Sequence, residues 1–145
     1  MNESKWPIRF LQLATLVSTW SKDSSTGVGS IIANDDNQII GVGYNGIPKG
    51  ATDDERLHDR NWKLQRILHS ENNAILNANS SVEGCTIYIN RPPCLACCSL
   101  IAQAGIKRVV FEEPDAEFRK RWNFEESLAW LKELGVKAVG YRRTE

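Results

Sequence analysis

The sequence predicts an α/β fold in which a mixed five-stranded sheet carries helices on both faces. Three patterns predict it: two β-rich segments flank a turn signal, strands and helices alternate through the second half, and apolar residues recur at helical spacing. Strands that alternate with helices pair in parallel through right-handed crossovers, while the two flanking segments form a hairpin. The length of 145 residues is that of a single domain, which we expect to span 1–145.

The chain opens with an amphipathic helix, and Pro7 is tolerated in its first turn. Its apolar residues at helical spacing are Phe10, Leu13, Ala14, Val17 and Trp20. Strands are expected at 27–33 and 38–42, because the Asn-Asp-Asp-Asn turn at 34–37 separates two β-rich segments. Residues 44–66 predict a long irregular excursion with a short helix at its end, over 59–65. Long loops inside compact domains are often functional.

The second half alternates helices and strands. Glu71, Ala74, Ile75 and Ala78 lie at i, i+3, i+4 and i+7, which places Glu71 on the buried face of a helix. Glycines end two later helices, and Asn123 with Glu126 forms a capping box. The remaining elements are a strand at 86–90, a helix at 94–104, a strand at 107–111, a helix at 123–134 and a strand at 136–141. The order is therefore α-β-β-α-β-α-β-α-β.

Composition narrows the class of protein. Lys and Arg total 18, as do Asp and Glu, so the formal charge is zero, whereas proteins that bind long nucleic acids usually have a basic excess. A small-molecule substrate fits this balance better than a long nucleic acid. No apolar run reaches membrane-spanning length and no secretory signal pattern is present, so we expect a cytoplasmic protein without a membrane partner. Four Cys in a reducing compartment favour metal binding or packing over disulfides.

His69, Cys94 and Cys97 predict a zinc site. Cys94 and Cys97 are three residues apart at the start of a helix, so both sulfurs can reach one ion, and three protein ligands leave a fourth position for water. A redox dithiol, a structural zinc knuckle and two buried Cys are the alternatives. A redox pair does not require His69 or a buried Glu, and a knuckle usually has four protein ligands. Spacing alone leaves Cys98 open as a ligand.

The motif H-x-E at 69–71 followed by P-C-x-x-C at 93–97 resembles the signature of zinc-dependent nucleobase deaminases. That pattern selects Cys97, so Cys98 and Cys85 are assigned to the core. In the mechanism it implies, one zinc ion per subunit activates water. Glu71 takes the proton of this water, protonates the ring nitrogen and later passes a proton to the leaving amine.

Beyond this signature, the chain resembles the deoxycytidylate (dCMP) deaminases over nearly its whole length. The similar blocks are 21–23, 28–32, 43–50, 69–75 and 103–107. The resemblance implies the three-layer α-β-α cytidine-deaminase-like fold and the hydrolysis of dCMP to dUMP and ammonia. It also implies a homo-oligomer, dimeric to hexameric, and in many members activation by dCTP and inhibition by dTTP, with Mg2+ bound only with such a triphosphate. A regulatory nucleotide would be sought in the block from Gly43 to Gly50.

Two residues are candidates for substrate binding. Asn45, in the G-Y-N-G-x-P-x-G block, offers both donors and acceptors, and the resemblance implies that it contacts the substrate. Arg91 departs from the family, which tends to place uncharged residues just before its Pro-Cys. It lies near the predicted zinc ligands, and three roles are open for it there. It binds the substrate phosphate, it alters which base is accepted, or it points outward and has no part in the site.

Other functions share parts of this pattern. A tRNA adenosine deaminase has the same zinc site, but the neutral charge and the long stretch between Asn45 and His69 argue against it. The G-Y-N-G block argues against a deaminase of free nucleosides or bases, while a 5-substituted dCMP remains a close variant. A noncatalytic zinc-bound nucleotide sensor is the alternative from another class. Glu71 discriminates against it, because a sensor needs no proton carrier beside the metal.

Overall fold

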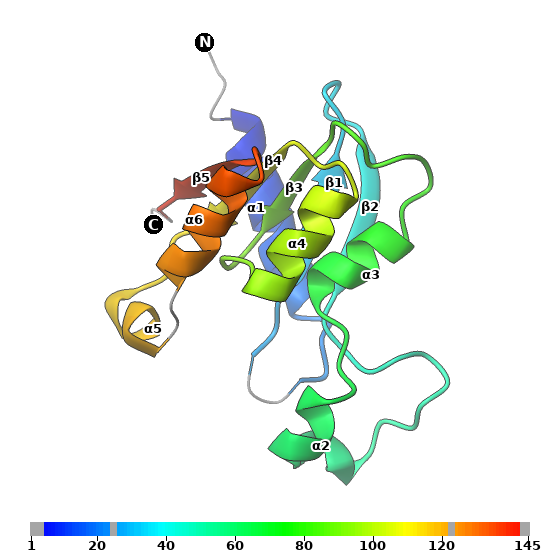
Figure 1. The fold of residues 1–145 in the computed structure, drawn as a ribbon. Helices are drawn as coiled ribbons and strands as arrows, with labels where there is room; N and C mark the ends of the chain where they lie inside the picture. The colour runs from blue at the N-terminus through cyan, green and yellow to red at the C-terminus, as the bar shows by residue number, and fades with distance from the viewer. Residues whose placement is uncertain (1–4, 24–25, 122–123, 143–145) are drawn as a thin grey trace.

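The computed structural model describes residues 5–23, 26–121 and 124–142, which form one mixed five-stranded sheet (Figure 1). The strand order is β2-β1-β3-β4-β5. β1 (Gly29–Ala33) pairs antiparallel with β2 (Ile39–Tyr44) and with β3 (Thr86–Ile89). β4 (Arg108–Glu112) and β5 (Lys137–Tyr141) continue the sheet in parallel with β3. The predicted hairpin and parallel crossovers are both confirmed.

Helices cover both faces of the sheet (Figure 1). α1 (Lys5–Ser18) packs on one face, and α3 (Ser70–Leu76), α4 (Leu95–Gln103) and α6 (Phe124–Glu133) cover the other. Successive side chains of a strand point to opposite faces, so Ile31 packs with α1 while Ile32 joins the core under α3 and α4. Every residue of β1 is buried, as expected for a strand covered on both sides.

The second of the two β2 glycines, Gly43, brings α3 close to the sheet. A Cβ built on Gly43 would collide with the backbone nitrogen of Ala74 in α3. A Cβ built on Gly41 would likewise collide with the carbonyl oxygen of Ala74. These glycines therefore let α3 lie directly on β2, which sets the position of the residues at the N-terminus of α3. Gly43, the first residue of the 43–50 block, thus admits a helix close to its backbone.

The excursion after β2 contains two short helices. η1 (Glu55–His58) is a 3-10 turn, and α2 (Arg60–Leu64) is the helix predicted at 59–65. In Figure 1, α2 projects away from the sheet and its helices. Asp54 and Asp59 cap these helices, with side chains accepting from the backbone N–H groups of Arg56 and Trp62.

Three expectations about helices need correction. α1 ends at Ser18, so Trp20 lies beyond it, 53% exposed, with its ring edge-on to that of Tyr44. α3 ends at Leu76, before Ala78. A further helix, α5 (Ala116–Arg121), was not expected. The predicted capping residue Asn123 falls outside the described residues. None of the helices in the described ranges is long and apolar enough to cross a membrane.

Candidate metal centre and its pocket

The helix starts of α3 and α4 bring three ligand-type side chains together. His69 is the N-cap of α3, Cys94 is the N-cap of α4, and Cys97 lies in the first turn of α4. His69 Nδ1 is 3.2 Å from Cys97 Sγ and 3.5 Å from Cys94 Sγ. All three ligand atoms lie within 4.8 Å of one another. Because His69 and Cys94 have extended backbones and cap no helix with their side chains, both side chains are available to converge.

The electrostatics of this cluster favour a cation. A hydrogen bond from the Cys97 thiol, helped by His69, lowers the pKa of Cys94 to about 4. The same thiol contact and burial raise the pKa of Cys97. The hydrogen bond with Cys94 raises the pKa of His69. One imidazole nitrogen and two sulfurs at such distances are the donor set that zinc takes in proteins, so these residues fit zinc.

Cys98 and Cys85 belong to the core, as the sequence predicts. Cys98 is fully buried, and its sulfur points to the carbonyl oxygens of Pro93 and Ser127, away from His69. Burial raises the pKa of Cys98 to about 12, which suits a packing residue. Cys85 is buried at the start of β3, with its sulfur beside the carbonyl of Ser81.

Glu71 lies in the first turn of α3 and is 4% exposed. The Ser70 hydroxyl donates to Glu71 Oε1 at 3.0 Å, and Ser30 Oγ lies 2.7 Å from Ser70 Oγ. Since Ser70 has one hydroxyl proton and gives it to Glu71, Ser30 must donate to Ser70. Burial raises the pKa of Glu71. The sequence analysis missed this chain of hydroxyls, although a Ser amid the apolar residues of β1 is a signal that could have revealed it.

A cavity of about 580 Å³ opens beside the cluster. His69, Glu71, Asn45 and Arg91 all line it, so the structure brings the predicted substrate-binding residues to the predicted catalytic one. Its other lining residues are Asp23, Thr26, Val28, Arg60, Lys63, Leu64, Ile67, Ser70 and Pro92. Three cationic side chains and two carboxylates line it, and one of the cations, Lys63, is paired with Asp23. The guanidinium groups of Arg60 and Arg91 are suited to an anionic ligand.

Asn45 is a structural centre of the cavity wall. Its Oδ1 accepts from the backbone N–H of Val28 at 2.9 Å. Its Nδ2 donates to the carbonyl of Thr26 at 2.9 Å and to Asp23 Oδ2 at 3.4 Å. Asn45 is buried, and these bonds join the end of β2 to the loop that precedes β1. Oδ1 has two lone pairs, and the bond from Val28 uses one of them.

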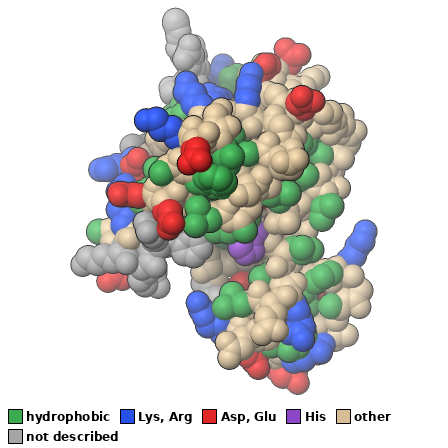
Figure 2. All heavy atoms as spheres, in the orientation of Figure 1, with side chains coloured by type: hydrophobic (Ala, Val, Ile, Leu, Met, Phe, Trp, Pro, Cys, Tyr) green, Lys and Arg blue, Asp and Glu red, His purple; other side chains and the backbone are tan. Residues whose placement is uncertain are grey.

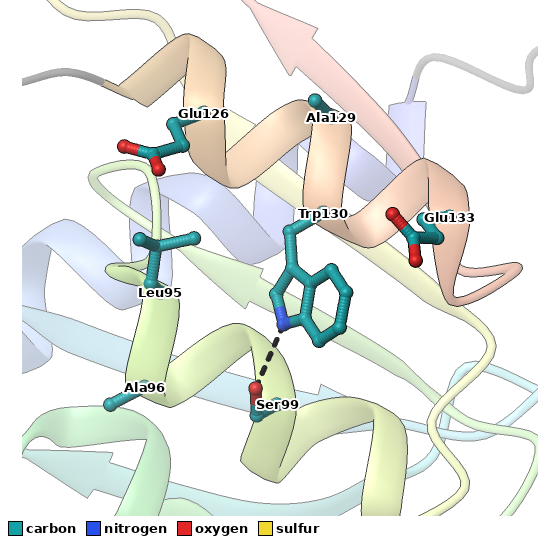
Figure 3. Close-up of a pocket in the computed structure, with 7 residues that line it drawn as sticks. All are labelled: Leu95, Ala96, Ser99, Glu126, Ala129, Trp130 and Glu133. Carbon is teal, nitrogen blue, oxygen red and sulfur yellow. Dashed lines mark hydrogen bonds between the residues drawn. The ribbon is translucent and has the colours of Figure 1, made fainter.

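Further cavities among the described residues lie outside this pocket. One of about 700 Å³ borders the 43–50 block, is lined by Trp20, Tyr44, Lys22 and Lys49 among others, and shares Asn45 with the first. Another of about 580 Å³ lies between α4 and α6 (Figure 3). There the indole N–H of Trp130 donates to Ser99 Oγ at 2.8 Å across the two helices. The described residues lining this third cavity include no His or Cys.

Residues 4–113 match the family model of the cytidine and deoxycytidylate deaminase zinc-binding region. This range includes the three candidate zinc ligands, Glu71 and every residue that lines the cavity beside them. The chain belongs to this deaminase family. It is 44% identical over 119 residues to an uncharacterised deaminase of Aliivibrio fischeri, covering 82% of this chain and 80% of that protein. It is 43% identical over 114 residues to the deoxycytidylate deaminase of Homo sapiens, covering 74% of this chain and 64% of the human protein.

A solved structure with the same fold is the dCMP deaminase of cyanophage S-TIM5, crystallised with dCMP and dUMP. Its TM-score is 0.74 at 23% sequence identity, over 92% of this chain and 95% of the phage chain. The fold class predicted from the sequence is thereby confirmed for this deaminase family member. The chain spans less than two thirds of its human relative, so what the relatives act on enters below as a proposal.

Proposed function

We propose that this chain catalyses the zinc-dependent hydrolytic deamination of dCMP to dUMP with release of ammonia. The observation that carries the proposal is the convergence of His69 Nδ1 and the sulfurs of Cys94 and Cys97 beside a cavity lined by the buried Glu71. Relatives named deoxycytidylate deaminase at 43–44% identity support the choice of dCMP.

His69, Cys94 and Cys97 would hold the zinc ion. Bound zinc supplies a Lewis acid that makes water nucleophilic near neutral pH. Glu71 carries two protons in turn. It accepts one from the attacking water and gives it to the ring nitrogen next to the attacked carbon; it then takes the proton of the hydroxyl added at that carbon, which becomes the carbonyl, and gives it to the leaving amine. A carboxyl whose pKa is raised by burial suits this work, because it accepts a proton more readily than an exposed carboxylate does.

The cationic side chains of the cavity support a nucleotide over a free base. Arg60 and Arg91 line the same cavity as Glu71. A guanidinium binds phosphate oxygens through two parallel N–H groups, so either Arg can recognise the 5′-phosphate of dCMP. Asn45 is proposed to contact the substrate through the acceptor capacity that its own hydrogen bonds leave open.

Regulation and assembly belong to the same proposal. The cavity that borders the 43–50 block has two aromatic side chains, Trp20 and Tyr44, and two cations, Lys22 and Lys49. Aromatic faces and ammonium groups are suited to the base and phosphates of a nucleotide, which supports dCTP and dTTP as effectors, with Mg2+ accompanying the triphosphate. We also propose that the chain forms a homo-oligomer.

One substrate panel tests the activity. Ammonia release would be measured from dCMP, 5-methyl-dCMP, deoxycytidine, cytosine and CMP, each with and without dCTP and dTTP. We expect turnover of dCMP, with weak or no turnover of cytosine. Activity on cytosine without activity on dCMP would refute the proposal, and equal activity on 5-methyl-dCMP would extend it to 5-substituted nucleotides.

A further inference from the structure

Lys63 and Asp23 form a buried ion pair next to the catalytic cavity. Lys63 Nζ lies 2.9 Å from Asp23 Oδ1, and the two side chains are 7% and 6% exposed. Five other ion pairs among the described residues each have a solvent-exposed partner. Charges removed from water are costly unless they are paired. A buried pair between two segments of the chain therefore fixes the position of one segment relative to the other.

The segments it joins are 40 residues apart in the sequence. Asp23 lies in the loop after α1, and Lys63 lies in α2, which projects from the sheet in Figure 1. At its base the excursion is closed by Gly46 and Leu68, which exchange two backbone hydrogen bonds of 3.0 and 2.8 Å. Leu68 directly precedes His69. Figure 2 shows the excursion as a lobe below the main body, with a hollow between them.

Asp23 continues the connection into the cavity wall. Its Oδ1 also accepts from the backbone N–H of Thr26 at 3.2 Å, and its Oδ2 accepts from Asn45 Nδ2 at 3.4 Å. Asn45 in turn accepts from the backbone N–H of Val28. Lys63, Asp23, Thr26, Val28 and Asn45 all line the cavity beside Glu71. A continuous polar network therefore runs from α2 to the edge of the sheet along one wall.

We propose that Lys63 is a positioning residue for the deamination reaction: its ion pair with Asp23 holds the 45–68 excursion in place and so sets the wall against which the substrate binds. The inference rests on the proposed function for its kinetic test. The ammonium group acts through Asp23 and Asn45, which distinguishes it from a phosphate ligand. Loss of the pair misplaces the wall for every substrate of this cavity, whether or not it carries a phosphate.

Four variants test the proposal. Lys63→Met and Asp23→Asn each break the pair, the double variant Lys63→Met/Asp23→Asn removes both charges, and Lys107→Met breaks the exposed pair of Lys107 with Asp35 as a matched control. We expect KM to rise at least about tenfold, for dCMP and deoxycytidine alike, in both single variants, since small misplacements near reacting atoms cost this much or more. We expect kcat to change less than about threefold, because the proton carrier is untouched.

The other readouts separate positioning from a purely structural role. Zinc content should stay at the wild-type level. KM of the double variant should match KM of the single variants, because all three lose the same contact. Hydrogen exchange within 45–68 should be faster in Lys63→Met than in Lys107→Met or the wild type. Should Lys63→Met fail to fold, the double variant provides the test, since it leaves no unpaired buried charge.

Two results would overturn the proposal. A lower melting temperature with unchanged KM shows a structural role alone, and a KM increase for dCMP but not deoxycytidine shows a direct phosphate contact. If the wild type has no activity on dCMP, the proposed function fails while the exchange measurement still decides the positioning role: unaltered exchange in 45–68 refutes it.

Discussion

Replacing Glu71 with Gln isolates the proton-carrying role from zinc binding. Gln has nearly the same shape, and its amide oxygen can accept the Ser70 hydroxyl that now donates to Glu71 Oε1 at 3.0 Å. The three proposed zinc ligands are untouched. The substitution therefore removes the proton carrier with little structural disturbance. General acid-base catalysis contributes about 10²–10⁴-fold per group. Because Glu71 would act at each proton transfer, we expect kcat to fall toward or beyond the upper end of that range.

The same substitution should lower activity but raise the stability of the metal-free protein. Burial raises the pKa of Glu71 in the folded state, so the unfolded state ionises at lower pH than the folded state does. Above its unfolded-state pKa this carboxyl therefore destabilises the metal-free protein, and the loss of stability grows until the pH passes the folded-state pKa. At neutral pH, metal-free Glu71→Gln should unfold at a higher temperature than the metal-free wild type.

The assay combines ammonia release from dCMP, metal analysis and thermal unfolding. Glu133→Gln, an exposed carboxylate of α6, is the matched control and should leave all three unchanged. Activity of Glu71→Gln above a tenth of the wild-type rate would refute the proton-carrying role. Loss of zinc from this variant would show instead that Glu71 helps to hold the metal.

Four further outcomes are expected. Cys98→Ala should keep its zinc and lose about 1 kcal/mol of stability as a core substitution, whereas Cys97→Ala should lose the zinc. Metal analysis and denaturation measure both effects. Zinc loss from Cys98→Ala would contradict the assignment of Cys98 to the core. Ser70→Ala leaves the buried hydroxyl of Ser30 without its acceptor, so we expect the protein to lose about 1–3 kcal/mol of stability and kcat to fall several-fold. An unchanged kcat would show that the Ser70 hydroxyl does not orient Glu71. Arg91→Ala should raise KM for dCMP at least about tenfold with little effect on deoxycytidine, and equal effects on both would count against a phosphate contact. In the metal-free protein, the folded-state pKa of Cys94 is lowered to about 4, so its thiolate persists down to about that pH. The stability that the thiolate contributes is fully present above the ordinary thiol pKa, declines as the pH falls below it, and is lost once the pH has fallen through about 4. Alkylation followed by mass spectrometry should show the pH dependence of the thiolate, and a midpoint near the ordinary thiol pKa would contradict it.

The parts of the fold that depend on local pattern could be predicted from the sequence. The hairpin at 34–37, the strand-helix alternation and the helix start at Cys94 follow from spacing and turn residues. α5 was missed because six residues are too few to show helical periodicity. Trp20 continued the helical spacing but lies past the end of α1, because spacing alone does not show where a helix stops.

Contacts between distant segments could not be predicted in the same way. The candidate zinc ligands were named by a known signature, because spacing alone did not decide between Cys97 and Cys98. The hydroxyl chain behind Glu71 joins β1 to α3, and the Lys63–Asp23 pair joins α2 to the loop after α1. Nothing in the spacing of these residues indicates their partners, since each pairing depends on how the elements pack. Gly43 shows the same limit, because its close neighbour is a helix 27 or more residues away.

The most direct test of the central claim is the fate of dCMP in water labelled with heavy oxygen. The wild-type protein, loaded with zinc, would be incubated with dCMP and the product examined by mass spectrometry alongside ammonia release. The account predicts dUMP carrying one labelled oxygen and one equivalent of ammonia, with neither formed by Glu71→Gln. Unchanged dCMP together with conversion of deoxycytidine or cytosine would contradict it.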